Sequence, residues 1–299
     1  MSDASKHWQR WGLLLLKCFG VVVFLWILRR IDRQQLVTVL QSARVTPLLL
    51  GIVLTFVGNA LRVWRWQMLT RGVGIASPLP TAWRAYHIGI FLATITPAKV
   101  GEFGRVAYLD KKKTSTGTAA SLLIIERLGD ILTMGLLALV AIAFLFGAEQ
   151  FSLVATLIAA ALLAGIVLAW IGCRMLPGDV RLFLRRLRSW RVLTPFIAMT
   201  LLIWTVYFVW CVSFAQAVGI AVPLLNLVAA FTIAAAVAVL PIAPSGLGTR
   251  DAALITLLTP YGVSPSHAVA LSLLLFCAIL LSGLPGAWYW TRGTRSRAS

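Results

Sequence analysis

The chain places acidic residues inside or beside long apolar stretches, and most of them have an arginine close by in sequence. The acidic residues are Glu102, Glu126, Asp130 and Asp251, and the nearby arginines are Arg105, Arg127 and Arg250. An isolated charge at the centre of a membrane costs roughly 3 kcal/mol or more, so each one requires a partner, water or a bound group. These charges could pair with one another and fix the ends of helices. They could equally balance a site that binds a charged headgroup, and both interpretations stay open here.

Two short segments rich in helix breakers accompany these charges. Residues 95–101 and 242–248 both fit the pattern Ile-x-Pro-x-x-(Val/Leu)-Gly. Proline removes a backbone donor, and glycine permits backbone angles that other residues adopt only at a cost. In lipid, such backbone is tolerated only where protein buries it or where it lines a polar cavity, so both segments are expected on a ligand path. The predicted breaks are Pro97, Gly101, Pro244, Gly246 and Gly248, and Lys99 lies in the first segment.

The likeness of these two segments has two explanations. It could record an internal inverted repeat, or it could arise by chance in a chain that carries many prolines and glycines.

A further basic group stands at the end of the second long apolar stretch, in the sequence Asn59-Ala60-Leu61-Arg62-Val63-Trp64-Arg65-Trp66. Arginine beside tryptophan at such an end is typical of an anchor at the membrane interface. Alternatively, Arg62 could turn inward, one helical turn from Asn59 and Trp66, and bind a lipid phosphate. Its planar guanidinium can donate two hydrogen bonds to phosphate oxygens.

The elements that must position these residues are membrane helices. Hydrophobic residues make up 60% of the 299 residues and charged residues only 12%, whereas a soluble domain has about 25% charged residues. The net charge of +18 comes from lysines and arginines clustered at the ends of apolar stretches, where they set topology and meet anionic headgroups. No soluble basic domain is apparent, so binding of nucleic acid is not expected.

About 20 apolar residues span a bilayer, and about seven stretches come close to this length: 11–28, 47–66, 124–146, 151–173, 195–217, 222–243 and 267–290. Two shorter pieces, 84–97 and 251–260, adjoin the breaker segments and are expected to be re-entrant or broken helices. The predicted fold is therefore an all-α, polytopic integral membrane bundle in a single domain, 1–299. It would comprise an N-terminal tail at 1–10, a membrane bundle at 11–290 whose first span is uncleaved, and a basic C-terminal tail at 291–299.

Arginines in short loops set the predicted orientation. The stretch from Arg174 to Arg191, the lysines at 111–113 and the C-terminal arginines are expected in the cytoplasm, which places the turn from Gly147 to Gln150 outside. Residues 29–46 also carry arginines but would face outward. There a short amphipathic helix would lay an apolar stripe in the headgroup layer, formed by Ile31, Leu36, Val39 and Leu40.

The residues that catalysis or metal binding would require are scattered. His7, His87 and His267 lie far apart, and the four cysteines stand singly, without the spacing of a zinc site or a redox motif. The chain has no Gly-Lys-Ser/Thr phosphate loop. We therefore expect no metal, no cofactor and no enzymatic activity, and any transport would run downhill, couple to ions or depend on a partner.

Four pieces of the sequence, in order, resemble the integral-membrane domain of lysylphosphatidylglycerol synthases and its stand-alone, flippase-like relatives. They are residues 61–66 (LRVWRW), 96–102 (TPAKVGE) leading to Arg105, 126–130 (ERLGD) and 244–251 (PSGLGTRD). The likeness extends from about residue 11 to residue 290. Two departures limit what it implies. We expect no synthase activity, because the soluble aminoacyl-transfer domain is not in this sequence, and Asp251 stands where relatives often have glutamate.

The resemblance implies a bundle in the cytoplasmic (inner) membrane that moves a lipid across it. We expect a lipid translocase or lipid-binding transporter for a phosphate-bearing or aminoacylated envelope lipid, with membrane lipids as its partners. In this mechanism Lys99, Arg105 and Arg250 attract the phosphate, while acidic residues balance the empty site. The full set of predicted lipid-binding residues is Arg62, Lys99, Glu102, Arg105, Glu126, Arg127, Asp130, Arg250 and Asp251.

Two alternatives to transport stay open. One is a non-catalytic scaffold for a glycosyltransferase or another enzyme of envelope-lipid synthesis. The other is a membrane enzyme that acts on lipid phosphates, although no pair of nucleophile and base is visible. Neither the cargo nor the oligomeric state follows from the sequence.

Overall fold

The computed structural model describes residues 26–27, 29, 31–72, 78–108, 116–174, 181, 190–239 and 248–295. These residues form helices joined by turns, with no strand among them, which confirms the all-α prediction. The predicted first span at 11–28 lies almost wholly outside the described residues. The lysines at 111–113 also lie outside them.

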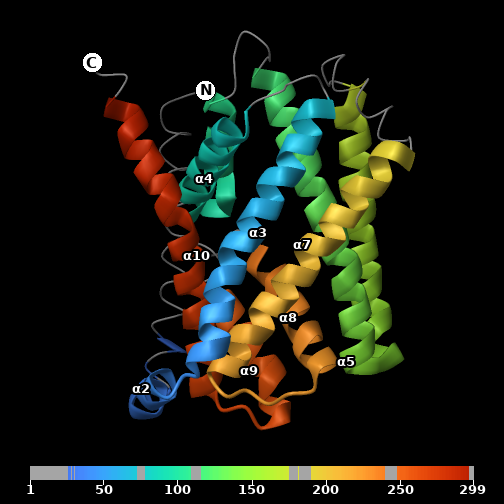
Figure 1. The fold of residues 1–299 in the computed structure, drawn as a ribbon. Coiled ribbons are helices and arrows are strands. Elements are labelled where there is room, and N and C mark those ends of the chain that lie inside the picture. The colour runs from blue at the N-terminus through green and yellow to red at the C-terminus, as the bar shows by residue number, and fades with distance from the viewer. Residues whose placement is uncertain are drawn as a thin grey trace, which may run out of the picture.

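Four helices within the described residues contain segments long and apolar enough to cross a membrane. They are α3 (Val45–Gly72), the first part of α5 (Thr116–Arg174), α7 (Trp190–Ala217) and α10 (Pro265–Arg295). At about 1.5 Å of rise per residue, the 28 residues of α3 extend about 42 Å, which exceeds the hydrocarbon core of about 30 Å. These long helices stand together as a bundle in Figure 1, as the predicted spans at 47–66, 124–146, 195–217 and 267–290 require.

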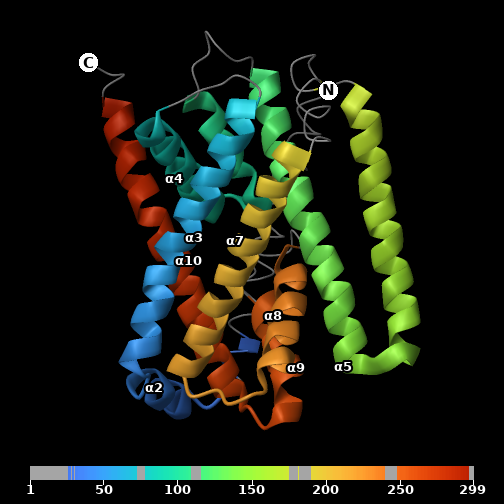
Figure 2. The ribbon, with the colours of Figure 1, turned by 45° about the vertical axis from the view of Figure 1, so that its right-hand side comes forward.

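Helix α5 turns back on itself. It has 59 residues and would extend about 88 Å if it were straight. Figure 2 shows instead that its ribbon descends, bends sharply and rises again, so that its two arms are antiparallel. The arms correspond to the stretches predicted at 124–146 and 151–173, and the backbone of the expected turn at 147–150 is helical.

Helix α4 (Leu79–Ile95) and the 3-10 helix η1 (Pro97–Tyr108) form a hairpin that fills only one half of the bundle's height (Figures 1 and 2). α4 ends at Thr96 because the residue before a proline is pushed into extended backbone, here φ −108° and ψ 144°. The Thr96 hydroxyl donates to the Leu92 carbonyl at 2.7 Å and accepts the Gly101 N–H at 2.7 Å. A Cβ at Gly101 would come within 2.2 Å of the Leu92 carbonyl oxygen, so the turn requires glycine. The α-helix therefore ends immediately before Pro97, and a 3-10 helix continues the chain.

A second half-length pair, α8 (Leu224–Val239) and α9 (Thr249–Leu258), occupies the opposite half of the bundle (Figures 1 and 2). α8 has 16 residues and extends only about 24 Å, so it is shorter than the full span predicted at 222–243. Gly248 precedes α9 with a φ of 83°, in the left-handed region that glycine adopts readily. The short helix η3 (Thr259–Tyr261) then leads into α10. The predicted breaks Pro244 and Gly246 lie outside the described residues.

The two halves of the described chain have the same arrangement in opposite orientations. Each consists of a long helix, a half-length hairpin and a second long helix: first α3, α4–η1 and the first arm of α5, then α7, α8–α9 and α10. α3 packs against α7, while α10 packs along α4 and α5 packs along α8. Each hairpin is thus covered by the closing helix of the other half. The described helices thus have the arrangement of an inverted repeat.

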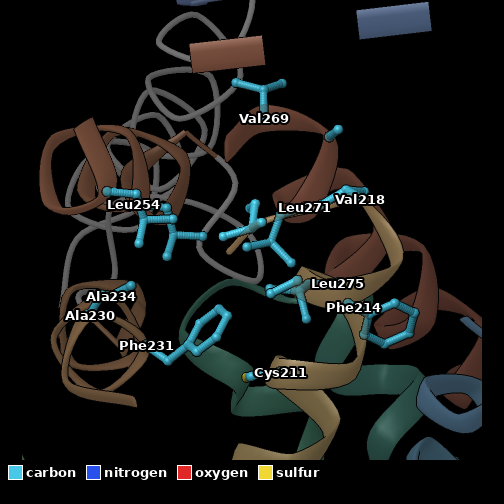
Figure 3. Packing of buried hydrophobic residues seen from close by; sticks show 14 of the residues in the cluster. Cys211, Phe214, Val218, Ala230, Phe231, Ala234, Leu254, Val269, Leu271 and Leu275 are labelled. Carbon is cyan, nitrogen blue, oxygen red and sulfur yellow. The ribbon is translucent and has the colours of Figure 1, made fainter. Parts of the chain in front are cut away.

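Each half also has its own hydrophobic cluster. One cluster is built around Trp66, Tyr86 and Leu122, and joins α3, α4, η1 and α5. The other joins α2, α7, α8, α9 and α10, and Figure 3 shows Cys211 of α7 near Phe231 of α8 and Leu275 of α10. The two half-length pairs, α4–η1 and α8–α9, therefore belong to different clusters.

The segment predicted to face outward contains α2 (Arg33–Gln41). Asp32 caps this helix by accepting the N–H groups of Gln34 and Gln35 at 2.9 and 3.1 Å. α2 lies at the end of the bundle opposite the end of α10 (Figure 1). Its apolar stripe does not lie in a headgroup layer, because Leu36 and Val39 are buried in the second cluster against α10.

Candidate functional site

Glu126, on the first arm of α5, is the centre of a buried ion-pair network. Its side chain is fully buried and is contacted by Arg65 of α3 at 3.2 Å and by Arg105 of η1. Arg65 also binds Asp130, one turn further along α5, through two hydrogen bonds of 2.6 and 2.9 Å. Paired contacts between one guanidinium and one carboxylate are strong and fix orientation. The network therefore joins α3, η1 and α5.

A second pair extends this network toward the surface. Arg127 binds Glu102 of η1 and approaches Asp130 at 3.6 Å. Its side chain is 34% exposed, whereas those of Arg65 and Arg105 are 1% and 2% exposed. The whole network contains three arginines and three carboxylates, so its formal charges cancel. They are Arg65, Arg105 and Arg127, and Glu102, Glu126 and Asp130. Mutual pairing is what makes such burial tolerable.

Arg105 has further partners that hold its charge. Its Cζ atom lies 4.1 Å from the ring centroid of Trp66 and 4.7 Å from that of Tyr86. Guanidinium groups are attracted to the faces of aromatic rings, most strongly where water is excluded. Arg105 is therefore committed to Glu126 and to these two rings, and it has little charge to offer a phosphate.

Arg62, one turn before Arg65 on α3, has no such partners. It is half-buried and makes no hydrogen bond or ion pair within the described part of the chain. Its guanidinium lies over Gly58, where an added Cβ would be 3.4 Å from Arg62 Nη1 and 3.9 Å from Val206 Cγ1 of α7. Arg62 thus lies where α3 meets α7.

Asn59 adds a second unmatched donor beside Arg62. It is buried, and its Nδ2 atom has no hydrogen-bond partner in the part of the chain that the structure describes. Because residues three apart share a helix face, both donors lie on one side of α3. Among the described residues, this face supplies no acceptor for either side chain.

Arg250 and Asp251 lie at the start of α9, in the other half. Arg250 is 7% exposed and donates to two neutral oxygens, the Ser272 hydroxyl at 3.1 Å and the Ser272 carbonyl at 2.8 Å. Asp251 does not pair with it, since its carboxylate accepts the Gly248 N–H. Within the described residues, Arg250 therefore has no acidic partner.

The structure sorts the predicted site residues into separate groups. Five of them lie in the network around Glu126, namely Glu102, Arg105, Glu126, Arg127 and Asp130. Arg62 stands beside this network, whereas Arg250 and Asp251 lie in the opposite half. Lys99 is part of η1, but its side chain lies outside the described residues.

The expected meeting of the two breaker segments involves residues 242–247, which lie outside the described residues. One expectation about the site residues needs correction. Arg65 is not an interfacial anchor, since it is 1% exposed and paired twice. The prediction missed Arg65 as a site residue. The spacing of Glu126 and Asp130 on one helix face was the available signal, because two such carboxylates require a cation from another helix.

The sequence was compared with known proteins and with protein families. No curated protein matches the chain. The profile of the family described as the lysylphosphatidylglycerol synthase TM region matches residues 11–286. That match covers most of the chain, including the network, Arg62 and Arg250. The chain therefore belongs to the family of the lysylphosphatidylglycerol synthase transmembrane region.

Proposed function

We propose that this protein is a lipid translocase or lipid-binding transporter of the cytoplasmic (inner) membrane, in which Arg62 and Asn59 receive the phosphate of the headgroup. The observation that carries the proposal is the half-buried Arg62 guanidinium at Gly58, near Val206 of α7, which has no partner within the described residues. The buried and unpartnered Nδ2 atom of Asn59 lies on the same face of α3. An unpaired guanidinium inside a span is costly unless another group compensates its charge. Phosphate oxygens suit this position, because they accept hydrogen bonds from both side chains.

The network around Glu126 takes a different part in this mechanism. Its three arginines are neutralised by its own carboxylates, so Arg62, and not Arg105, binds the phosphate. The network holds α3, η1 and α5 in place around the donors. The role is transport without catalysis, and the acyl tails of the lipid remain in the bilayer.

The inverted arrangement of the two halves supports transport. In transporters with this architecture, substrate binds near the middle of the membrane where broken helices interrupt the bundle, and one half moves against the other. The end where α3 finishes with Arg71 and where α10 carries Arg292 faces the cytoplasm in this proposal, following the charge rule. There Arg292 lies over the ring of Trp288, with 4.0 Å from its Cζ atom to the ring centroid, a contact suited to a membrane interface.

The test is movement of a fluorescent phospholipid by the purified protein in liposomes. Wild type should move the lipid, and Arg62→Gln should slow movement about tenfold or more, because a hydrogen bond to a charged group contributes roughly 1.5–3 kcal/mol. Arg71→Gln is the matched control, since Arg71 is exposed at the end of the same helix.

Two results would contradict the proposal. If wild type moves no lipid, and an envelope-lipid enzyme co-purifies in equal amount, the scaffold alternative holds. If Arg62→Gln moves lipid at the wild-type rate, the donors on α3 are not the phosphate site.

A further inference from the structure

One face of α3 carries side chains with hydrogen-bonding groups, although this helix is long and apolar enough to cross a membrane. They follow one another at steps of three or four residues, so they share one side of the helix. They are Thr55, Asn59, Arg62, Trp66 and Thr70, of which Arg62 is half-buried and the other four are buried. Polar groups inside a span are costly and often mark the path of a substrate or an ion.

The two threonines at the ends of this face have hydrogen-bond partners. The Thr55 hydroxyl donates to the Gly51 carbonyl at 2.9 Å and accepts the indole N–H of Trp210 on α7 at 2.8 Å. The Thr70 hydroxyl donates to the Gln67 carbonyl at 3.1 Å. Each threonine hydroxyl therefore has the acceptor that its hydrogen requires.

The three side chains between these threonines have no partner for their donors among the described residues. The donors are the Nδ2 atom of Asn59, the guanidinium of Arg62 and the Nε1 atom of Trp66, and together they form the donor row. The row begins near the middle of the 28 residues of α3 and rises about 10 Å toward the end that carries Arg71. Because every member of the row donates, a group rich in acceptors is required to satisfy it.

The Trp66 ring is held in place from two sides. It is 0% exposed and packs in the cluster that contains Tyr86 and Leu122. The Arg105 guanidinium lies over it, with 4.1 Å from its Cζ atom to the ring centroid, and Arg105 is itself paired with Glu126. The network around Glu126 thus fixes the direction of the indole N–H. A donor that is already fixed loses little freedom when a ligand binds to it.

The donor row also lies where the cover of this face changes from one half of the molecule to the other. On one side of Arg62 the face meets α7, since an added Cβ at Gly58 would lie 3.9 Å from Val206 Cγ1. On the other side, Trp66 is covered by the hydrophobic cluster of the first half. A movement of one half against the other, as in transporters with inverted repeats, would therefore change the contacts at Arg62.

We propose that the donor row is the path of a phosphodiester headgroup, and that the Trp66 indole is its first donor on the cytoplasmic side. This inference rests on the proposed function, in which Arg62 and Asn59 receive the phosphate, and it adds the step between them and the cytoplasm. A headgroup that enters from the Arg71 end meets Trp66, then Arg62, and reaches Asn59 near the middle of the helix. Successive donors are one helical turn, about 5 Å, apart, so phosphate oxygens can bind the next donor before they leave the last.

A replacement that keeps the shape of Trp66 but removes its donor tests this path. Benzothienylalanine at this position has a bicyclic ring of similar size in which sulfur replaces the indole N–H. Because a buried donor without a partner costs free energy, this variant should melt at or above the wild-type temperature in detergent. It should nevertheless move a fluorescent phospholipid in liposomes about tenfold more slowly than wild type.

The matched control is the same replacement at Trp64, which is 59% exposed on α3 and should move lipid at the wild-type rate. Asn59→Leu removes the donor at the other end of the row by ordinary mutagenesis, and it should also slow lipid movement about tenfold. If the variant at Trp66 melts well below wild type, its N–H has a structural partner and the donor row is wrong.

Free phosphate offers the same acceptor oxygens as a phospholipid, so a competition experiment separates the two ligands. Excess inorganic phosphate on both sides of the liposome membrane should leave lipid movement by wild type unchanged. If inorganic phosphate slows that movement, the row binds soluble phosphate and its assignment to a lipid headgroup is overturned.

The donor row and the proposed function fail in different ways. If wild type moves lipid and the variants at Trp66 and Asn59 move it equally fast, the row is wrong while transport stands. If wild type moves no lipid, native mass spectrometry of the phospholipid retained in detergent decides the role of the row. Lower retention by both variants would keep the row as a binding site without transport, and unchanged retention would overturn it.

Discussion

Two arginines one turn apart on α3 have opposite surroundings. Arg65 is almost completely buried and contacts both Glu126 and Asp130, whereas Arg62 is half-buried and unpaired within the described chain. Removing one partner of a buried ion pair leaves the other charge without compensation, which costs far more than the pair contributes. The same substitution at the two positions should therefore affect different properties.

Arg65→Gln should unfold the protein at a much lower temperature, with a loss of about 3–5 kcal/mol, because it leaves the Glu126 and Asp130 carboxylates short of their shared cation. The melting temperature of the purified protein in detergent measures this loss. Arg62→Gln should melt close to wild type, since it breaks no ion pair. Equal melting temperatures for wild type and Arg65→Gln would show that the network does not hold the fold.

At the scale of helices, close contact between the backbones of α10 and α4 determines how α10 covers the α4–η1 hairpin. α10 packs along α4 through glycines, and a Cβ at Gly286 would lie 1.9 Å from the His87 carbonyl oxygen. A backbone oxygen cannot move aside as a flexible side chain can, so the two helices must separate to admit a methyl group. Gly283, one turn earlier, is different, because its nearest neighbour would be the Thr94 hydroxyl at 3.6 Å.

Gly286→Ala should therefore destabilise the protein and weaken the docking of α10 on α4, while Gly283→Ala should be tolerated. Replacing a helical glycine with alanine stabilises an unstrained helix by about 1 kcal/mol, so the Gly283 variant could melt slightly higher than wild type. Thermal melting of both variants in one detergent provides the comparison. Identical melting of the pair would contradict the close contact.

Helix α2 offers a second test at this scale. Leu36→Ala should cost about 2–5 kcal/mol, because it leaves a cavity in the second hydrophobic cluster. Val37, its neighbour, is 50% exposed and should tolerate alanine. Thermal melting again separates the outcomes. If Leu36→Ala melts like wild type but binds liposomes less well, the apolar stripe of α2 lies among lipid headgroups, as the sequence predicted.

The whole molecule is organised by the inverted relation of its halves. The α4–η1 hairpin lies in one half of the bundle's height, and the α8–α9 pair lies in the other half, which also holds α2 and the start of α3 (Figure 1). Many transporters that expose one site alternately to the two faces of the membrane are built from such oppositely directed halves.

This organisation predicts a labelling pattern in a background from which the four native cysteines have been removed. An impermeant thiol reagent should reach Gln34→Cys on α2 in intact cells, because Gln34 is exposed at the outward end. It should reach Arg71→Cys only after the membrane is permeabilised, since basic helix ends remain in the cytoplasm. Labelling of both positions in intact cells would exclude the proposed topology.

Local properties of the sequence determined that the chain is a helical membrane protein interrupted at Pro97 and that its buried charges need partners. Apolar length, proline and glycine act within a few residues, so their effects can be predicted without knowing the neighbours. The tertiary structure alone decided the pairing, because Arg65 and Asp130 are 65 residues apart and meet only when α3 packs near α5. It also decided that Arg62 has no partner among the described residues and that α2 is buried against α10, since burial depends on which surfaces face each other. Helix spacing identifies which residues share a face, but only packing shows what that face contacts.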